Sequence, residues 1–251
     1  MDGAASVQRL TLPNLGTDVT VGLGSHLAYG PYFAADLQAS PASDGTVAVL
    51  RDVFRTFPPE IGGVVIYDDA TARPNALCGV GQVCGCTGDF DDEFDSIHWN
   101  ADGSVMFAAN NGDGFTFYTI PVTASGFGKV NDYQLPFNAA GITIHYDPVT
   151  KYVYEDNGMI IDPIAGVSVG RLGNPRASGL PVADGALGKA FVLQTPRSGS
   201  DPFTLTSFDI QKLTPIATAT ISNVVGAASH FIRWGSDGLA FTTEKRQRKA
   251  G

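Results

Sequence analysis

Residues 95–137 contain four short strand-like runs and constrain the fold more than any other part of the chain. The runs read SIHW, SVMFAA, FTFYTI and NDYQLPF, and NADG, NNGDG and a Ser/Gly loop separate them. Short runs rich in Val, Ile, Phe, Tyr and Thr between Asn-Gly and Asp-Gly turns are typical of antiparallel hairpins. Four such strands make the blade of a β-propeller if the unit recurs along the chain.

Units of the same kind recur on both sides of this stretch. Before it, residues 36–40, 46–52 and 63–67 are predicted strands, with a weak fourth within 76–83. After it, two compact units of four runs follow between residues 141 and 221. No segment of useful length has helical periodicity. The chain is therefore predicted to be all-β.

Half-units stand at the two ends of the chain. Residues 7–23 resemble a third and a fourth strand, and residues 230–243 resemble a first and a second. Joining the halves completes one blade and removes exposed sheet edges. We therefore expect a β-propeller of five four-stranded blades closed by strands from both termini, with 1–243 as one domain and 244–251 as a basic, disordered tail. The alternative is a fragment of a longer propeller that starts and stops within a blade.

Length and composition agree with a globular protein that has many turns. A chain of 251 residues, 43% of them hydrophobic, is long and apolar enough to bury a large core. Its 30 Gly and 15 Pro fit a fold with many turns. The net charge of −9 argues against general binding to nucleic acid or to anionic membranes. No run approaches the ~18 apolar residues of a membrane span. The start, MDGAASVQRL, has neither the basic nor the apolar region of a signal peptide.

Several corners of the repeat resemble a known kind of sequence. SIHWNADGSVMFAAN, MIIDPIAGVSVGRL and FIRWGSDGLAFTT are similar to repeats of secreted bacterial β-propeller proteins of the YVTN/NHL-like type. In those repeats a strand ending in DP or D, a short turn and a VxVGxxP-like strand recur. The likeness covers most of 17–243 and implies a propeller that is secreted, periplasmic or on the cell surface. It transfers no catalytic residue, and the repeats of this chain are irregular in length.

Aligning the first corner of each unit places Gln38, His98, His145, Val182 and Arg233 in one column. Four of these five residues are polar and lie between apolar neighbours. First strands of propeller blades line the central axis, so we expect these side chains to meet in an axial ligand pocket. Imidazoles serve as metal ligands or acid–base groups, and Arg binds carboxylate or phosphate. The alternative is that they are structural groups, hydrogen-bonded to neighbouring blades.

An acidic cluster precedes the strand SIHW. The segment GDFDDEFDS supplies Asp89, Asp91, Asp92 and Asp95, and carboxylate oxygens at this density suit Ca²⁺ or another divalent metal. The cluster lacks the spacing of an EF-hand loop, so a solvated acidic loop is the alternative. Asp36 and Asp95 both lie at the beginnings of first strands and suggest a glycosidase-like carboxylate pair, although they align one position apart.

Three cysteines lie together in the segment CGVGQVCGC. A disulfide between Cys78 and Cys84, or between Cys78 and Cys86, would close this loop in an oxidising compartment. Three cysteines cannot all pair within one chain. A three-thiolate metal site lacks a matching fourth ligand nearby.

Two classes of function agree with these observations. The first is an extracytoplasmic binding or interaction module that holds a small molecule, a glycan or a protein ligand. It is favoured because no complete catalytic constellation appears, and the sequence contains no H-E-x-x-H and no phosphate loop. The second is a hydrolase or lyase acting on a sugar, lactone or ester, with or without a metal. It would use His98 and His145, or the pair Asp36 and Asp95.

Overall fold

The computed structural model describes eight stretches of the chain, which are 5–26, 30–53, 61–77, 94–110, 116–134, 143–173, 179–196 and 201–244. These residues form β-strands and connecting turns, and no helix occurs among them, so none of them lies in a helix that could span a membrane. Contacts within the chain divide it into two compact units, Met1–Gln134 and Leu135–Gly251. Each unit has sheets and cores of its own.

The first unit begins with a two-stranded hairpin and continues with two larger antiparallel sheets. The hairpin consists of β1 (Ser6–Thr11) and β2 (Gly16–Gly22). The first large sheet has the order β3 (Ser25–His26), β4 (Gly30–Ala39), β5 (Thr46–Val53), β6 (Ile61–Asp68), β7 (Thr71–Ala72). The second has the order β8 (Ser96–Trp99), β9 (Val105–Asn110), β10 (Thr116–Thr123), β11 (Gly126–Phe127), and β12 (Asn131–Gln134) also pairs with β10.

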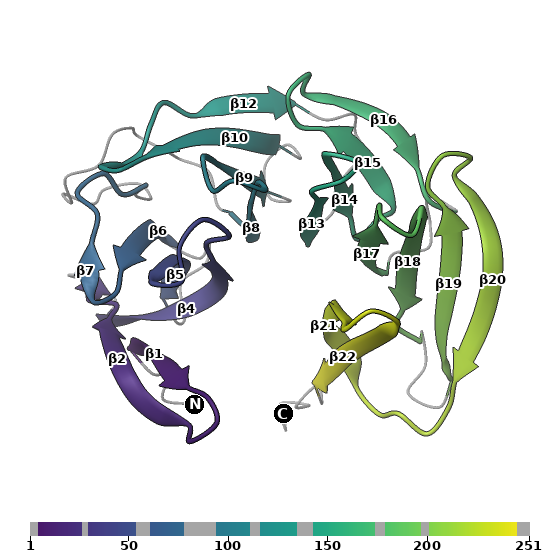
Figure 1. Cartoon of the computed structure of the whole chain (residues 1–251), viewed down its shortest axis with the longest axis horizontal. Helices are drawn as coiled ribbons and strands as arrows, with labels where there is room; N and C mark the ends of the chain where they lie inside the picture. Colours follow the sequence, from purple (N-terminus) through teal and green to yellow (C-terminus); the bar gives the residue numbers. More distant parts are fainter. Residues whose placement is uncertain are drawn as a thin grey trace, which may run out of the picture. The chain divides into compact units, whose positions relative to one another are not determined.

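The second unit contains two four-stranded sheets and a terminal hairpin, each in sequential antiparallel order (Figure 1). The first sheet consists of β13 (Ile144–Asp147), β14 (Tyr152–Glu155), β15 (Met159–Asp162) and β16 (Val167–Arg171). The second consists of β17 (Leu180–Asp184), β18 (Lys189–Gln194), β19 (Phe203–Asp209) and β20 (Thr214–Ile221). The hairpin pairs β21 (Ala227–Trp234) with β22 (Gly238–Glu244).

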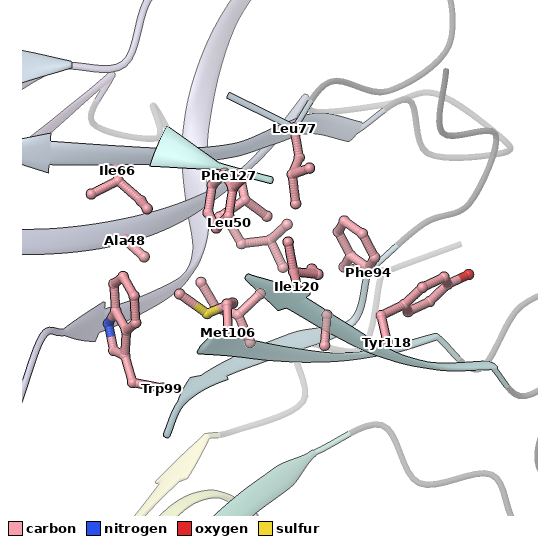
Figure 2. Packing of buried hydrophobic residues seen from close by; sticks show 13 residues of the cluster. Ala48, Leu50, Ile66, Leu77, Phe94, Trp99, Met106, Tyr118, Ile120 and Phe127 are labelled. Atoms are coloured by element: carbon pink, nitrogen blue, oxygen red, sulfur yellow. The ribbon is translucent and has the colours of Figure 1, made fainter. Parts of the chain in front are cut away.

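Neighbouring sheets in each unit pack face to face through apolar side chains. In the first unit, Leu50 and Ile66 of one sheet meet Trp99, Met106 and residues of β10 from the next (Figure 2). Alternate residues of the same strand β5, such as Val49, face the β1–β2 hairpin instead. A sheet that is buried on both faces needs apolar residues at successive positions, which explains runs such as TVAVL and SVMFAA.

A main-chain contact adds a second link between the two large sheets of the first unit. The Asn75 amide donates to Ser125 O at 2.8 Å, and the Phe127 amide donates to Asn75 O at 2.9 Å. Gly126 lies between Ser125 and Phe127 with a φ of +113°. A Cβ at this position would collide with Asn75 O. Only glycine therefore fits at position 126 without moving the backbone.

The predicted strands correspond closely to the observed ones, with two corrections in the first large sheet. Strand β4 begins at Gly30 rather than at residue 36, because Tyr32 and Phe33 extend the ladder opposite Val53 and Asp52. The fourth position of this sheet is occupied in two places: the short β7 follows a tight turn, and beyond Pro74 Leu77 pairs with Val64 of β6 through two main-chain hydrogen bonds. Leu77 lies in the expected range 76–83, of which residues 78–83 are outside the described part of the chain.

Candidate functional site

The predicted polar column lies on the strand that precedes the first corner of each unit, as the repeat required. Gln38 is on β4 and His98 on β8 in the first unit. His145 is on β13 and Arg233 on β21 in the second unit. The apolar member of the column, Val182 on β17, is fully buried. The contacts of these residues can therefore be compared strand by strand within each unit.

In the first unit, polar groups near Gln38 join β4 to β8. One oxygen of the Asp36 carboxylate accepts a hydrogen bond from the Ile97 amide at 2.9 Å. Its other oxygen accepts from the Leu37 amide at 2.7 Å and from Gln38 Nε2 at 3.3 Å. The indole Nε1 of Trp99 donates to Gln38 O at 3.0 Å. The carboxylate and the carbonyl therefore act as structural acceptors between two blades.

His98 is held in one tautomer by its neighbour. Its Nδ1 lies 2.8 Å from Trp99 O, and a carbonyl can only accept, so Nδ1 carries the proton. Desolvation by burial lowers the pKa of His98, while the Trp99 carbonyl and the negative charge of Asp36 act in the opposite direction. The imidazole is therefore neutral near neutral pH.

In the second unit, Arg233 ties the terminal hairpin to β17. Its Nε donates to Asp184 Oδ2 at 2.9 Å, and both side chains are less than one-fifth exposed, at 18% and 17%. The terminal nitrogens Nη1 and Nη2 donate to Gly238 O at 2.6 Å and to Ser236 O at 2.7 Å. The guanidinium also lies 5.8 Å from the ring centroid of Phe191. These contacts are those of a structural group.

The corner position, two residues after the column, carries a set of structural side chains that the sequence analysis did not identify. Asn100 Oδ1 accepts from the Val105 amide, and Asp184 Oδ1 accepts from the Leu187 amide. Asp147 accepts from the Thr150 amide and also from the Gly185 amide at the next corner. Asn and Asp cap turns in this manner. The signal was present in the alignment, because these residues share one column.

A hollow lies between the β1–β2 hairpin and strands β4 and β5, and we call it the hairpin groove. It has a volume of about 190 Å³. Its apolar lining consists of Val7, Val19, Val21, Leu37, Ala39 and Val47, and its polar rim includes Arg9, Asp44 and Asp69. Leu37 is 42% exposed, so part of this apolar surface is open to solvent.

An exposed ion-pair network borders the hairpin groove. Arg9 on β1 contacts Asp18 on β2 at 3.0 Å and Asp69, in the turn after β6, at 2.7 Å. The hydrogen bond from Arg9 is the main cause that lowers the pKa of Asp18. Asp44 lies on the same rim. The two carboxylates of Asp44 and Asp69 and the one guanidinium of Arg9 give the rim a net negative charge.

Several predicted site residues lie outside the described part of the chain. These are the acidic residues Asp89, Asp91 and Asp92 and the disulfide candidates Cys78 and Cys84. Asp95 is described and exposed, and its amide donates to Ala109 O at 2.8 Å. Within the described stretches, no three His, Cys, Asp or Glu side chains gather as a metal site would require. The calcium site stays a prediction.

No family model matches the sequence, and no curated protein matches it either. Among solved structures, the chain is similar to dihydro-heme d1 dehydrogenase NirN in complex with DHE, with a TM-score of 0.59 and 13% identity over 97% of this chain and 50% of that one. It is also similar to the Dos1 propeller, with a TM-score of 0.55 and 11% identity over 85% and 55%. It is similar as well to a chain of the mitotic checkpoint complex, with a TM-score of 0.55 and 15% identity over 82% of this chain and 56% of that one.

These likenesses, at 11–15% identity, concern the fold alone. The fold is a β-propeller. The described sheets and the Dos1 propeller together confirm this part of the sequence prediction. The chain spans about half the length of the structures that it matches. The number of blades, the closure by both termini and the YVTN/NHL-like type stay predictions.

Proposed function

We propose that this β-propeller is a binding and interaction module that holds its ligand or partner in the hairpin groove. The observation that carries the proposal is a hollow with an apolar floor, partly open to solvent, beside a charged rim. Binding sites commonly combine an apolar lining with a few polar groups that orient the ligand. The groove has this combination within one unit of the chain.

The volume of the groove favours one class of partner over the others. Pockets for drug-sized molecules span roughly 300–1,000 Å³, whereas the groove measures about 190 Å³. A space of this size accommodates an inserted side chain better than a whole cofactor or an oligosaccharide. Among a small molecule, a glycan and a protein ligand, the groove therefore supports the protein ligand.

The contacts of the predicted catalytic residues support binding rather than catalysis. A catalytic carboxylate must be available to the reacting atoms, but Asp36 accepts three hydrogen bonds, two from donors on its own strand β4 and one from the Ile97 amide of β8. Arg233 donates from all three of its nitrogens. These contacts favour a structural role for Asp36 and for Arg233.

We test the groove with the neutral probe N-acetylleucine methylamide, using protein with labelled Val and Leu methyl groups. Titration should shift the methyl resonances of Val19, Leu37 and Val47 in a saturable way, because an aliphatic side chain fits among them. Val167 and Val169, which are exposed on the outer strand β16, serve as internal controls. Shifts that are equal at the groove and at β16 would contradict the proposal.

We further propose that the protein works outside the cytoplasm, as a secreted, periplasmic or cell-surface protein. The proposal rests on the cysteine-rich segment and on the low content of charged residues. Protein made under oxidising conditions should contain one intramolecular disulfide formed by Cys78 with Cys84 or Cys86. Mass spectrometry after alkylation without reduction measures this directly. Three alkylated thiols would rule the disulfide out.

A further inference from the structure

We infer that Asp44 and Gly45 form a self-modification site, at which the main chain rearranges spontaneously to isoaspartate. The side-chain carboxyl of Asp44 is the electrophile, and the main-chain amide of Gly45 is the nucleophile. The inference goes beyond the proposed function, because it does not depend on whether the hairpin groove holds a ligand. It rests on a comparison of the four Asp-Gly pairs within the described residues.

The chemistry explains which features of the structure matter. The amide nitrogen of the glycine forms a bond to Cγ of the aspartic acid, and the carboxyl hydroxyl leaves with the amide proton as water. Glycine favours this step, because no side chain stands beside the attacking nitrogen. Water then opens the five-membered succinimide at either carbonyl. Opening at the main-chain carbonyl leaves the chain running through Cβ and Cγ, with a free α-carboxylate. The reaction therefore requires a carboxyl that can turn and an amide without another acceptor.

The pair Asp44–Gly45 meets both requirements. It lies in the turn between β4 and β5, and within the described residues neither the Asp44 carboxyl nor the Gly45 amide has a hydrogen bond. The bonds of the turn come from its neighbours. The Ser40 amide donates to Thr46 O at 2.9 Å, and the Thr46 amide donates to Ser43 O at 3.2 Å. These bonds close the turn around the pair and leave its two reacting groups unengaged.

The equivalent pair of the next sheet, Asp102–Gly103, is held at both groups. Asp102 Oδ1 accepts hydrogen bonds from the amide and from the hydroxyl of Ser104. The Gly103 amide donates to Asn100 O at 3.4 Å. The bonds from Ser104 also lower the pKa of Asp102, so less of its carboxyl is in the protonated form that loses water. Rearrangement at this corner is therefore slower.

In the second unit, Asp184–Gly185 is held more firmly still. The Asp184 carboxylate accepts from the Leu187 amide at 3.0 Å and from Arg233 Nε at 2.9 Å. The Gly185 amide donates to Asp147 Oδ1 at 3.0 Å. The carboxylate and the amide thus have acceptors and donors of their own, and both must be released before they can react with each other.

The fourth pair, Asp237–Gly238, is intermediate. The Asp237 carboxyl has no hydrogen bond within the described residues, but Gly238 is the first residue of β22 and lies in register opposite Trp234. Formation of a succinimide there would pull the start of the strand out of the ladder. The expected order of reactivity, from fastest to slowest, is Asp44, Asp237, Asp102, Asp184.

The rearrangement at Asp44 has a structural consequence, because it inserts one carbon atom into the main chain before Gly45. The Asp69 amide donates to Gly45 O at 2.7 Å, and the Asp69 carboxylate contacts Arg9 of β1 at 2.7 Å. Displacement of Gly45 O loosens this connection between the β4–β5 turn and the β1–β2 hairpin. Hydrogen exchange of the Asp69 amide, which should become faster in the aged protein, measures the effect.

The experiment ages the full-length protein below its melting temperature at about pH 5, where part of the carboxyl population is protonated. Peptide mapping with electron-transfer dissociation then quantifies isoaspartate at each pair. We expect about tenfold more isoaspartate at Asp44 than at Asp102 or Asp184, because the latter two must first break hydrogen bonds. Protein aged in urea is the control, in which all pairs should react at similar rates once the folded restraints are lost.

Two variants test the cause of the order. Asp44→Glu keeps the charge but requires a six-membered ring, so it should abolish the product at this turn. Ser104→Ala removes one bond that holds Asp102 and should raise isoaspartate there about fivefold, with Asp44 unchanged. No conversion at Asp44, equal conversion of Asp44 and Asp102 in the folded protein, or an unchanged Asp102 in Ser104→Ala would each overturn the inference.

Discussion

The two terminal hairpins, β1–β2 and β21–β22, each pack on a neighbouring sheet and are each tied to it by one Arg–Asp pair. In the first unit Arg9 contacts Asp69 at 2.7 Å, with side chains 41% and 65% exposed. In the second unit Arg233 contacts Asp184 at 2.9 Å, with side chains 18% and 17% exposed. The distances are almost equal, but the surroundings differ. Burial makes the second pair a structural joint, while the first pair is left at the surface, where it can meet a partner.

The two hairpins also differ in how deeply their side chains are buried against the neighbouring sheet. Phe231 of β21 packs into a core with Val182, Leu193 and Phe203. The β1–β2 hairpin contributes Val21 to the core beneath it, but most residues of β1 are exposed. Few buried apolar contacts mark a region of lower local stability, and ligand-binding elements are drawn from such regions. Four predictions test this contrast.

The largest effect is expected from removal of the β1–β2 hairpin. Deletion of residues 1–22 uncovers Val49, Val65 and Tyr67, which the hairpin helps to bury. It also removes the strands that the closure prediction pairs with the C-terminal half-blade, leaving strand edges prone to aggregation. We expect loss of cooperative melting or aggregation, measured by circular dichroism and light scattering. A truncated protein that melts like the full chain would show that closure is wrong.

The two Arg–Asp pairs should respond very differently to the same substitution. Asp184→Asn removes the charge opposite the buried Arg233 guanidinium and should lower the free energy of unfolding by about 2–3 kcal/mol. Asp69→Asn removes an exposed pair, and Asn tolerates the positive φ of +50° at this turn, so the change should stay within about 0.5 kcal/mol. Urea denaturation measures both. Equal losses would contradict the contrast drawn from burial.

The neutral hydrogen bond from Trp99 Nε1 to Gln38 O in the first unit should contribute less to stability than the Arg233–Asp184 ion pair in the second. Trp99→Phe removes the hydrogen bond from Nε1 to Gln38 O and should lower the free energy of unfolding by about 1–2 kcal/mol. Trp234→Phe is the control, because Trp234 is 69% exposed and its replacement should change stability by less than about 0.5 kcal/mol. If the control is as destabilising as Trp99→Phe, the indole bond is not the cause.

The smallest effect concerns the pH dependence of stability. Burial lowers the folded-state pKa of His98 below its ordinary value of 6.5. The stability linked to this residue is therefore complete above about pH 6.5 and is lost as the pH falls toward the lowered pKa, because the unfolded state binds the proton more readily. His98→Gln should consequently lose less stability than the parent between pH 7 and pH 5. An unchanged pH profile would show that His98 is not desolvated.

The same variant, together with His145→Gln, tests the axial pocket. If the polar column is a ligand or metal site, both variants should keep their melting temperatures and lose bound metal or ligand, as measured by elemental analysis of the purified proteins. Loss of stability alone would assign the two histidines a structural role. The bonds of Arg233, a member of this column, and of Asp36, which lies two residues before Gln38, agree with the structural alternative.

The strands and turns were largely predictable from the sequence, because local signals define them. Alternating apolar residues between Asp-Gly and Asn-Gly turns located β8, β9 and β14, and the shared column placed Gln38, His98 and Arg233 at equivalent positions. The bonds between blades were not predictable. The Asp36 carboxylate and its partner, the Ile97 amide, are 61 residues apart, and a single sequence does not show which acceptor lies opposite which donor.

The groove could not be predicted for a related reason. Its lining comes from β1, β2, β4 and β5, and each of its valines also fits an ordinary core position. What distinguishes the groove is that the hairpin stops short of Leu37, and this depends on how two sheets are placed against each other. A sequence pattern gives the face on which a residue lies but does not give the extent of its cover.

The joint between Asn75 and Gly126 has a consequence for how proteins of this fold diverge. Both of its hydrogen bonds join main-chain atoms, so exchanging the side chains of Asn75, Ser125 or Phe127 leaves the donors and acceptors in place. The main-chain contact itself constrains only Gly126, because a Cβ there would meet Asn75 O, whereas Phe127 is held by its place in the core. Two descendants of one ancestor could keep this joint unchanged and share a single glycine at it. A fold held by main-chain contacts can therefore be retained after the sequence similarity that identifies homologues has been lost.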